Sequence, residues 1–402
     1  MQLSIKNFAQ IESLDINFGA PGDLTILVGQ QATGKSLALQ WLKLANDSLS
    51  VKQDWARYGT NWKVPGQELR PLDMFFGEGL GQGYREDTTD IALNGKPLRL
   101  KTLFNTAPGR GHNDTAQESL YYIPAHRALL LADGWPKTFQ QHVSGTPYVA
   151  RAQSERLVQW LSNSTQAIFP IKTKLSNELR ELFNEAIFHN AALNIDKTSP
   201  QSRMILSVGP TGEIPYMAWT AGQREFVPLL IALYELLPSG TTNRLEHIET
   251  VVLEEPELGL HPKALFALGI AVLHLMARGY RVVVSTHSPL MVDFAWALGH
   301  LRQALNSKKE AAQNKHFLSA FALKNTAANK ALAEKVLKSE ARTYYLTYKK
   351  SSSDGFSRVR SQDISDLKTY SPNPDESSWG ELLSYSTHMA QVVSQLNMDV
   401  SN

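Results

Sequence analysis

Val28-Gly29-Gln30-Gln31-Ala32-Thr33-Gly34-Lys35-Ser36 is the stretch that decides the fold, because it fits the pattern G-x-x-x-x-G-K-[ST] at every fixed position. A short apolar run, Leu24 to Val28, precedes it and is typical of a buried strand. Leu37 to Leu42 follows it and begins a helical pattern. The pattern requires strand, loop and helix in this order. The sequence therefore predicts a phosphate-binding loop, and a glycine-containing turn that binds nothing is the less favoured alternative.

The residue types of this loop suit a nucleotide with its metal ion. Gly29 and Gly34 allow backbone N–H groups to close around phosphate oxygens, and the N-terminus of the following helix adds partial positive charge. Lys35 supplies a mobile cation, and Ser36 supplies a hydroxyl that can hold Mg²⁺. We therefore expect the loop to bind the phosphates of a nucleotide and Mg²⁺, with the middle of the cradle formed by Gln30, Gln31, Ala32 and Thr33.

The composition is that of an ordinary globular protein. Of its 402 residues, 43% are hydrophobic and 19% are charged, and the formal net charge of +2 is too small to indicate nucleic acid or an anionic membrane. The absence of cysteine excludes disulfides, thiolate metal sites and a cysteine nucleophile. The start of the chain lacks the apolar core of a signal peptide, and the longest apolar run, Ala264 to Ala277, is shorter than the ~20 residues that a bilayer requires. We expect a cytoplasmic protein that does not enter a membrane.

A second informative stretch is Thr220-Ala221-Gly222-Gln223, which opens an amphipathic helical pattern. Thr220 is a good N-cap residue, and the small side chains of Ala221 and Gly222 leave the helix N-terminus open. An open helix N-terminus beside a hydroxyl group can bind an anion. Taken alone, this signal is weak.

Two later strands strengthen it. The run Glu249 to Leu253 is typical of a buried strand and ends in Glu254 and Glu255, and a second run, Arg281 to Ser285, is followed closely by His287. Gly222, Glu255 and His287 are separated by about 30 residues each, the length of one strand–helix–strand crossover. The ends of these strands should therefore lie side by side. One carboxylate can hold the metal and the other can orient the attacking water.

Glu255 and His287 each have a structural alternative, a solvated strand-end carboxylate and a core histidine respectively. An earlier strand, Leu120 to Ile123, stops at a proline and delivers His126 and Arg127 to its end. The ligand lies at the carboxyl ends of the strands in sheets of this kind, so these two residues either contact phosphate or a partner or form a solvated strand end.

Together these motifs resemble an ABC-type ATPase domain of the kind shared by SMC, RecF and OLD-family (overcoming lysogenization defect) proteins, particularly the compact bacterial ATPases known as AAA-15 and AAA-21, which are common in anti-phage systems. The match covers roughly residues 1–50 and 200–300. The corresponding segments are Leu3 to Phe8 for the first strand, Gly29 to Ser36 for Walker A, Thr220 to Gln223 for the signature motif, Val251 to Glu255 for Walker B, Leu258 to Pro262 for the D-loop, and His287 for the switch histidine.

The resemblance implies an α/β fold, with a mixed sheet whose parallel core is flanked by helices. It also implies a site made by two chains, in which Lys35, Glu255 and His287 of one chain are catalytic, Ser36 and Glu254 bind Mg²⁺, and the signature motif of the second chain caps the γ-phosphate. The sequence departs from the family pattern in Gln31-Ala32, which stands where Asn-Gly is usual, and in Glu254, which many relatives replace by Asp. The segment Tyr122 to Arg127 occupies the region where a glutamine normally senses the γ-phosphate.

The motifs and the helical spacing also suggest how the chain is organised. We expect an ATPase lobe at 1–150, an insertion of two antiparallel helices at 151–200, the remaining ATPase motifs at 201–305, and a small α+β extension at 306–402. A hairpin is expected near residues 203–217.

The resemblance suggests a switch that forms an ATP-dependent homodimer or higher oligomer and controls a separate effector, a nuclease or toxin, in bacterial anti-phage defence. Residues 300–402 lack the strand-end Glu and later Asp-x-Asp of a Toprim nuclease, so we expect any nuclease to be a separate chain. The main alternative is a RecF- or SMC-like clamp that binds DNA, for which a cluster of lysines and arginines between Lys330 and Lys350 could supply a nucleic-acid face. An importer or exporter ATPase is a weaker alternative.

Overall fold

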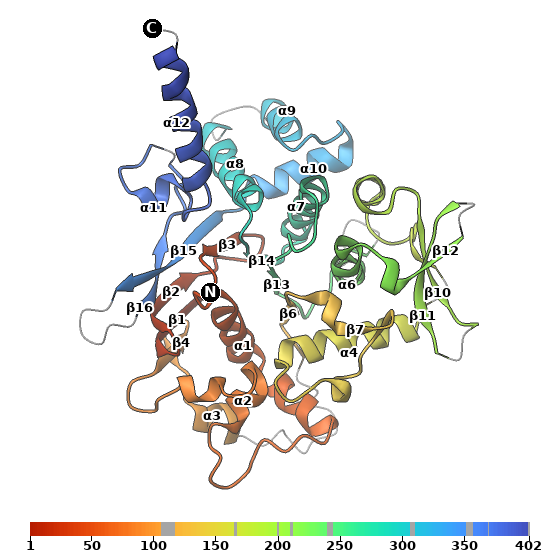
Figure 1. The fold of residues 1–402 in the computed structure, drawn as a ribbon, viewed down its shortest axis with the longest axis vertical. Coiled ribbons are helices and arrows are strands. Elements are labelled where there is room, and N and C mark those ends of the chain that lie inside the picture. Colours follow the sequence, from red (N-terminus) through yellow and green to blue (C-terminus); the bar gives the residue numbers. More distant parts are fainter. Residues whose placement is uncertain are drawn as a thin grey trace.

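The computed structural model describes residues 1–105, 117–164, 167–198, 201–209, 212–238, 244–305, 310–350, 357–368 and 370–400. Its central feature is a ten-stranded sheet with the order β5-β4-β1-β2-β16-β15-β3-β14-β13-β6 (Figure 1). The strands are β1 Gln2–Phe8, β2 Ile11–Asn17, β3 Leu24–Gly29, β4 Asp90–Leu93, β5 Lys96–Pro97, β6 Leu120–Ile123, β13 Thr250–Glu254, β14 Arg281–Ser285, β15 Ala341–Lys350 and β16 Ser357–Asp363.

The core of this sheet is parallel. Strands β6, β13, β14, β3 and β15 run in the same direction. At one edge, two antiparallel pairs, β1 with β2 and β4 with β5, join through antiparallel pairing of β1 with β4. Every residue of β3, β13 and β14 is buried, as expected for strands covered on both faces. The predicted fold class, an α/β fold with a parallel core in a mixed sheet, is confirmed.

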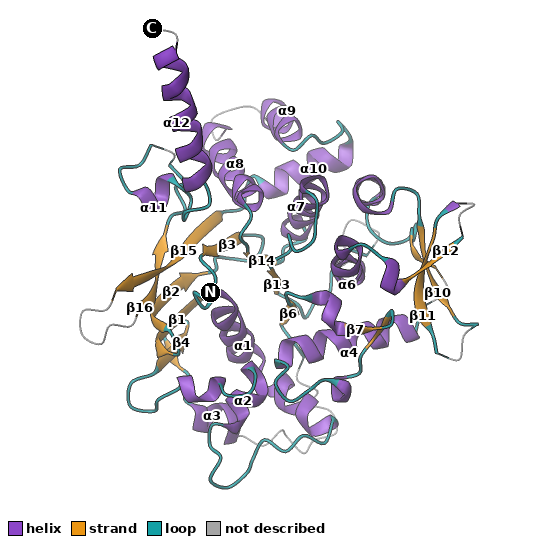
Figure 2. Cartoon of the chain, in the orientation of Figure 1, coloured by secondary structure: helices purple, strands orange, loops and turns teal. Residues whose placement is uncertain are grey.

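Helices cover both faces of the sheet (Figure 2). Successive strand residues point to opposite sides, so Leu24, Ile26 and Val28 of β3 join one hydrophobic core while Leu27 joins the other. The helices are α1 Lys35–Arg57, α2 Arg70–Phe76, α3 Leu100–Asn105, α4 Tyr148–Ser162, α5 Asn177–Phe183, α6 Ala221–Leu236, α7 Pro262–Ala277, α8 Pro289–Leu305, α9 Glu310–Ala320, α10 Ala327–Val336, α11 Pro374–Ser377 and α12 Ser384–Val400. The first core contains side chains of α6, α7 and α8, and the second contains side chains of α1 and α2.

The expected C-terminal extension requires a correction. Strand β15 pairs in parallel with β3, the strand that leads into the phosphate loop, and β16 pairs with β2. Residues 341–350 and 357–363 are therefore part of the main sheet and do not form an added unit. The physical reason is that β3 and β2 leave a gap between them, which the hairpin of β15 and β16 fills.

The expected helical insertion is also only partly correct. Helix α4 is present, but the second predicted helix is short, because α5 ends at Phe183 and passes into a π-helical turn at Asn184–Phe188. Ala167–Phe169 and Ala192–Asp196 of this segment are strands of an antiparallel four-stranded sheet that lies apart from the main sheet (Figure 1). Its strands are β9 Ala167–Phe169, β10 Ala192–Asp196, β11 Arg203–Ser207 and β12 Glu213–Pro215, and β11 and β12 form the predicted hairpin. Two short strands, β7 Leu131–Ala132 and β8 Trp135–Pro136, form a separate pair.

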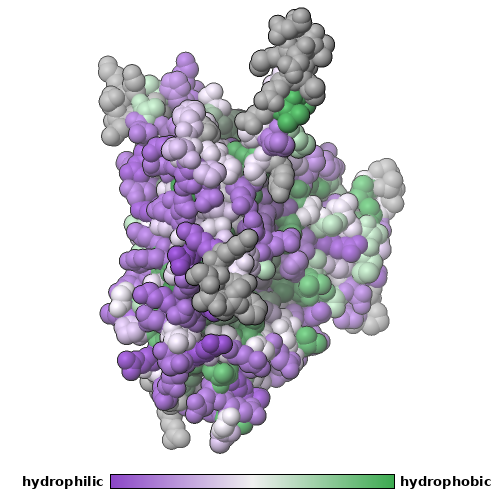
Figure 3. Space-filling model, turned by 60° about the vertical axis from the view of Figure 1, so that its left-hand side comes forward, coloured by the Kyte–Doolittle hydropathy of each residue, from purple (hydrophilic) through white to green (hydrophobic). Residues whose placement is uncertain are grey.

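The surface offers few large apolar areas in the view of Figure 3, where hydrophilic side chains predominate and apolar ones are scattered. Helix α12 stands away from the body of the molecule, near the C-terminus (Figure 1). In the part of the chain that the structure describes, none of the helices combines the length and the hydropathy needed to cross a bilayer.

Candidate functional site

The predicted phosphate loop joins the end of β3 to the start of α1. Gly34 caps α1 in the left-handed conformation, with φ 82°. Gly29 has φ 151°, and a Cβ atom there would lie 2.3 Å from the carbonyl oxygen of Leu346 in the neighbouring strand β15. Glycine is therefore required at position 29, because β15 leaves no room for a side chain.

Ala32 occupies the position where the family usually has glycine, and it adopts the left-handed conformation with φ 59°. Such a conformation is unfavourable for alanine and needs support from its surroundings. Its carbonyl oxygen accepts hydrogen bonds from Gln10 Nε2 at 2.9 Å and from Tyr348 Oη at 2.7 Å. Two distant parts of the chain thus hold the loop in shape, so the departure from Asn-Gly is compatible with a formed cradle.

Lys35 is buried at the base of the loop, with 5% of its surface exposed. Its Nζ donates hydrogen bonds to the carbonyl oxygens of Gly29 at 2.8 Å and Gln30 at 2.9 Å. Burial lowers the pKa of Lys35 to about 8, against the opposing effect of the nearby carboxylates Glu255, Glu257 and Glu254. The charge of this lysine is thus poorly solvated, a condition that an anionic phosphate would relieve.

Glu254 and Ser36 are the predicted Mg²⁺ ligands, and the structure places them together. Glu254 ends β13 and is 3% exposed. Burial raises its pKa, while the side chains of Tyr122 and Ser36 and the backbone N–H of Ala125 act in the opposite direction. The N–H of Ala125 donates to Oε2 at 3.3 Å, and Oε1 is buried without a hydrogen-bond partner.

This donor set fits the proposed metal. A buried carboxylate oxygen without a partner, next to a hydroxyl at the foot of a phosphate loop, is an oxygen environment of the kind that Mg²⁺ prefers. A cation between Ser36 and Glu254 would also compensate the cost of keeping that carboxylate charged.

Glu255 and His287 also lie together, as predicted from the ends of β13 and β14. His287 Nε2 is 3.7 Å from Glu255 Oε1. Burial lowers the pKa of His287, and the positive charge of Lys35 acts in the same direction, whereas Glu255 opposes both. The imidazole is therefore neutral near pH 7 and can offer one donor and one acceptor nitrogen.

Glu257 holds the histidine loop in place. Its Oε1 accepts a hydrogen bond of 2.5 Å from the backbone N–H of His287. Burial raises the pKa of Glu257, and this hydrogen bond opposes the rise. Glu257 thus fixes the backbone beside the site, and the sequence alone did not assign it this contact.

The signature stretch forms the predicted helix cap at the start of α6. The Thr220 hydroxyl accepts from the N–H of Gln223 at 3.2 Å, and the Gln223 side chain accepts from the N–H of Thr220 at 3.1 Å. This reciprocal pair is a capping box, so the Gln223 carboxamide serves its own helix. Thr220 and Ala221 are exposed, and Gly222 packs against the turn at Gly259.

The structure therefore brings the loop, the two carboxylates and His287 together at the carboxyl ends of the parallel strands. The signature stretch instead makes its contacts with Gly259 and, through a 3.5 Å hydrogen bond from Gln223 Nε2, with the carbonyl of Ile187. Phe8, an aromatic of the first strand, is fully buried against Trp41 and Phe76 and belongs to the core.

Arg127 is the site residue whose role the sequence left undecided. Neither expectation for it is correct, because its side chain is 1% exposed and bonds to backbone carbonyls within the protein. The sequence did carry a signal for this burial, because Arg127 is followed by the apolar residues Ala128 to Leu131, a pattern that favours a buried segment. His126, in contrast, is exposed at the strand end.

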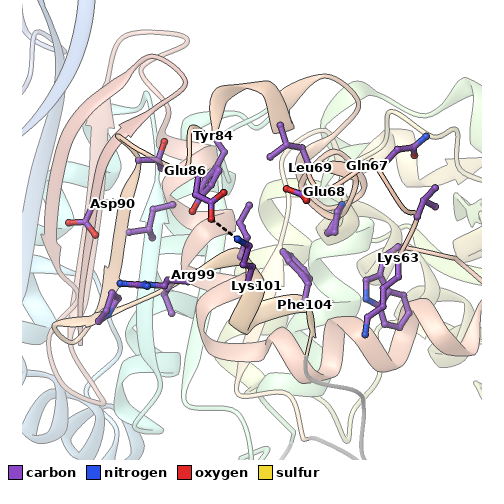
Figure 4. A pocket seen from close by; sticks show the side chains of 18 of the residues that line it. Lys63, Gln67, Glu68, Leu69, Tyr84, Glu86, Asp90, Arg99, Lys101 and Phe104 are labelled. Carbon is purple, nitrogen blue, oxygen red and sulfur yellow. Dashed lines mark ion pairs between the residues drawn. The ribbon is translucent and has the colours of Figure 1, made fainter.

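A cavity of about 950 Å³ lies elsewhere, between α2, α3 and the hairpin of β4 and β5 (Figure 4). It combines aromatic side chains such as Tyr84 and Phe104 with an ion pair of 3.1 Å between Lys101 and Glu86. None of its lining residues belongs to the predicted nucleotide site, so it is a separate feature of the N-terminal half.

Comparison with known proteins gives one family match. Residues 153–293 match the family model described as "AAA domain, putative AbiEii toxin, Type IV TA system". The matched segment includes the signature stretch, both carboxylates and His287, and it does not include the phosphate loop. No curated protein matches the sequence.

Several solved structures are similar at low sequence identity. An SMC head bound to the C-terminal winged-helix domain of ScpA has 11% identity and a TM-score of 0.41, with 90% of this chain and 97% of that chain covered. The SMC head domain from Thermotoga maritima has 13% identity and a TM-score of 0.31, with 73% and 90% covered. The dimeric ATP-binding cassette MJ0796 bound to ADP and phosphate has 11% identity and a TM-score of 0.33, with 73% and 90% covered.

Proposed function

We propose that the chain is an SMC/ABC-like P-loop ATPase that acts as a Mg²⁺-dependent switch, self-associates through ATP and controls a separately encoded effector. The observation that carries this proposal is the convergence of Lys35, the carboxylates Glu254 and Glu255, and His287 at the ends of neighbouring strands. Lys35 is poorly solvated and Oε1 of Glu254 has no hydrogen-bond partner, and a magnesium nucleotide would satisfy both needs.

The residues of the site have distinct tasks in this proposal. Lys35 exchanges its bonds to loop carbonyls for bonds to phosphate oxygens, and the loop N–H groups surround the same phosphates. Ser36 and Glu254 would hold Mg²⁺. When bound, Mg²⁺ neutralises charge that develops on the phosphate oxygens.

Glu255 and His287 act on the water that attacks the phosphate. The Glu255 carboxylate accepts a hydrogen bond from that water and orients it. The neutral His287 donates a hydrogen bond to a phosphate oxygen through one ring nitrogen, and Glu257 keeps its backbone in position through the 2.5 Å hydrogen bond. Water orientation and charge stabilisation are the main tasks of a protein in phosphoryl transfer.

A second copy of the chain completes the site. The N-terminus of α6 is exposed at Thr220 and Ala221, and the partial positive charge of a helix N-terminus favours an anion, although the N–H groups of Thr220 and Gln223 are taken up by the capping box. Its contacts within the chain run to Gly259 and Ile187, so the tip is available to a phosphate held by a partner copy. ATP would then join two copies, and hydrolysis would release them.

The effector is proposed to be a nuclease or toxin in bacterial anti-phage defence. Two observations support this part: the resemblance of the motifs to compact defence ATPases, and the match to a family described as a putative toxin of a type IV toxin–antitoxin system. A DNA-binding clamp has less support, because Arg342 of the basic cluster is already paired with Asp23 and Glu340.

The test combines hydrolysis, assembly and copurification. Purified chain should hydrolyse Mg-ATP, and Glu255→Gln should form an ATP-dependent dimer or larger oligomer in light scattering. A tagged Glu255→Gln chain loaded with ATP should retain the product of a neighbouring gene. Absence of ATP hydrolysis, or a monomer with ATP in both variants, would refute the proposal, and salt-dependent DNA binding without a copurifying protein would favour the clamp.

A further inference from the structure

Arg127 makes a dense set of contacts beside the site without reaching it. It begins a short 3₁₀ helix, Arg127–Leu130, after the turn that follows β6. One terminal nitrogen donates to the carbonyl oxygens of Pro124 at 3.1 Å and Glu254 at 2.9 Å, and the other donates to the carbonyl of Glu255 at 3.2 Å. The guanidinium therefore binds the backbone of both carboxylate residues, Glu254 and Glu255.

The same side chain reaches the helix that begins with the signature stretch. Its Nε donates to the carbonyl of Glu225 in the first turns of α6 at 3.0 Å. The Glu225 carboxylate accepts from the Arg127 backbone N–H at 2.8 Å and lies 3.6 Å from Nε. A buried guanidinium is costly unless its donors and its charge are matched, and here carbonyls match the donors while Glu225 matches the charge.

A second contact joins α6 to the residues that follow Glu255. A Cβ atom at Gly222 would lie 2.6 Å from the carbonyl oxygen of Gly259, and Gly259 itself has φ 68°. Backbone therefore lies directly on backbone at this point. The start of α6 therefore contacts the chain at Glu254 and Glu255 through Arg127. It also contacts the chain after Glu255, at Gly259.

The conformation of Glu255 explains why such attachment matters. Its φ is 40°, in the left-handed region that is unfavourable for a residue with a side chain. Its N–H donates to the carbonyl of Ser285 at 2.8 Å, and its carbonyl accepts from Arg127. The direction of the Glu255 carboxylate thus depends on bonds that the guanidinium supplies.

We infer that Arg127 is a positioning residue for hydrolysis, which holds the backbone of Glu255 in its active conformation and joins it to the signature helix of the same chain. This inference rests on the proposed function, because it concerns the water-orienting role of Glu255. A phosphate bound at the tip of α6 would act on Glu255 through Arg127, so the two ATP sites of a dimer would influence each other's hydrolysis.

The test compares Arg127→Lys with a matched control. Lysine keeps the positive charge, but its single ammonium group cannot donate to all of the carbonyls that the planar guanidinium contacts. The control is Arg180→Lys, because Arg180 also donates to three backbone carbonyls, those of Lys172, Lys174 and Leu175, but lies at α5. For each variant we would measure the thermal midpoint, the affinity for a fluorescent ATP analogue, kcat and KM.

We expect Arg127→Lys to lower kcat about tenfold or more while the affinity for the analogue changes less than about twofold. Arg180→Lys should leave kcat near that of the unmodified chain. In a Glu255→Gln background, Arg127→Lys should have little further effect on turnover, because the group that it positions is already lost. Glu225→Gln, which removes charge without changing size, should lower kcat in the same direction by a smaller factor.

Three results would overturn the inference: an unchanged kcat in Arg127→Lys, equal losses in Arg127→Lys and the control, or additive effects with Glu255→Gln. If Arg127→Lys lowers the thermal midpoint more than the control does, a loss of kcat in that variant could reflect instability. In that case the kcat of Glu225→Gln is the test, and an unchanged value counts against the inference. An unmodified chain that does not hydrolyse ATP would refute the proposed function itself. An active chain with an unaffected Arg127→Lys would refute only this inference.

Discussion

Lys35 gives the site a pH dependence that can be worked out from the structure. Its pKa is lowered to about 8 because burial disfavours the charged form more than the three neighbouring carboxylates favour it. Phosphate binds the protonated lysine. A rise in pH from 7 to 9 would therefore remove the proton on which the proposed binding depends.

The size of the effect follows from a single titration. With a pKa of about 8, about nine-tenths of the lysine is protonated at pH 7 and about one-tenth at pH 9, so the apparent Kd for ATP should rise about tenfold. The same titration changes folding stability in the opposite direction: stability rises with pH while the affinity for ATP falls. The unfolded chain, with the usual lysine pKa of 10.5, binds more protons between about pH 8 and 10.5, so this group makes the free energy of unfolding increase with pH.

The assay is a titration with a fluorescent ATP analogue at half-unit steps from pH 7 to pH 9, with the thermal midpoint recorded at each step. Weaker binding without a lower thermal midpoint would support the reasoning. Lys35→Arg is the control, because a guanidinium stays charged throughout this range and should remove the pH dependence of whatever affinity remains. An affinity that does not change with pH, or the same slope in the control, would show that Lys35 is not the titrating group.

Three further predictions concern single residues. Glu255→Gln should lower the rate of ATP hydrolysis at least a hundredfold and leave ATP affinity nearly unchanged; parallel loss of both would remove its role in orienting water. Glu254→Gln should raise the Mg²⁺ concentration needed for half-maximal hydrolysis, measured by metal titration, and an unchanged requirement would exclude it as a ligand. Gly222→Ala should lower the free energy of unfolding by about 1–3 kcal/mol in urea titration, because the added Cβ meets the carbonyl of Gly259 at 2.6 Å. Gly145→Ala, where an added Cβ meets no atom within 4 Å, should be neutral.

The geometry of the candidate nucleotide site was largely predictable because its parts are contiguous in the sequence. The pattern from Gly29 to Ser36 fixes a strand, a loop and a helix together, and the observed β3 and α1 follow it closely. Glu255 and His287 were predictable as neighbours because parallel strands of a crossover unit end at the same edge of the sheet. In both cases a local pattern was sufficient to determine the geometry.

The remaining features depend on contacts between distant segments, which local patterns do not encode. The strand pattern of β15 was visible, but nothing in Tyr344 or Tyr345 identifies β3 as the neighbouring strand. The segments that became β9 and β10 are too short for their alternation to outweigh the helical spacing before them. The burial of Arg127 depends on carbonyls from α6 and β13, which are about a hundred residues or more away in the chain.

Residues of the C-terminal part of the chain contact the phosphate loop near the N-terminus and help to fix its shape. The carbonyl of Leu346 in β15 is the atom that excludes a side chain at position 29, and Tyr348 supports the loop through the carbonyl of Ala32. Farther along, Glu381 accepts a hydrogen bond of 2.6 Å from the Gln30 side chain. Because residues beyond 340 shape the loop at three points, an effector bound to the C-terminal region would have a direct mechanical route to the nucleotide, and the nucleotide would have the same route to the effector.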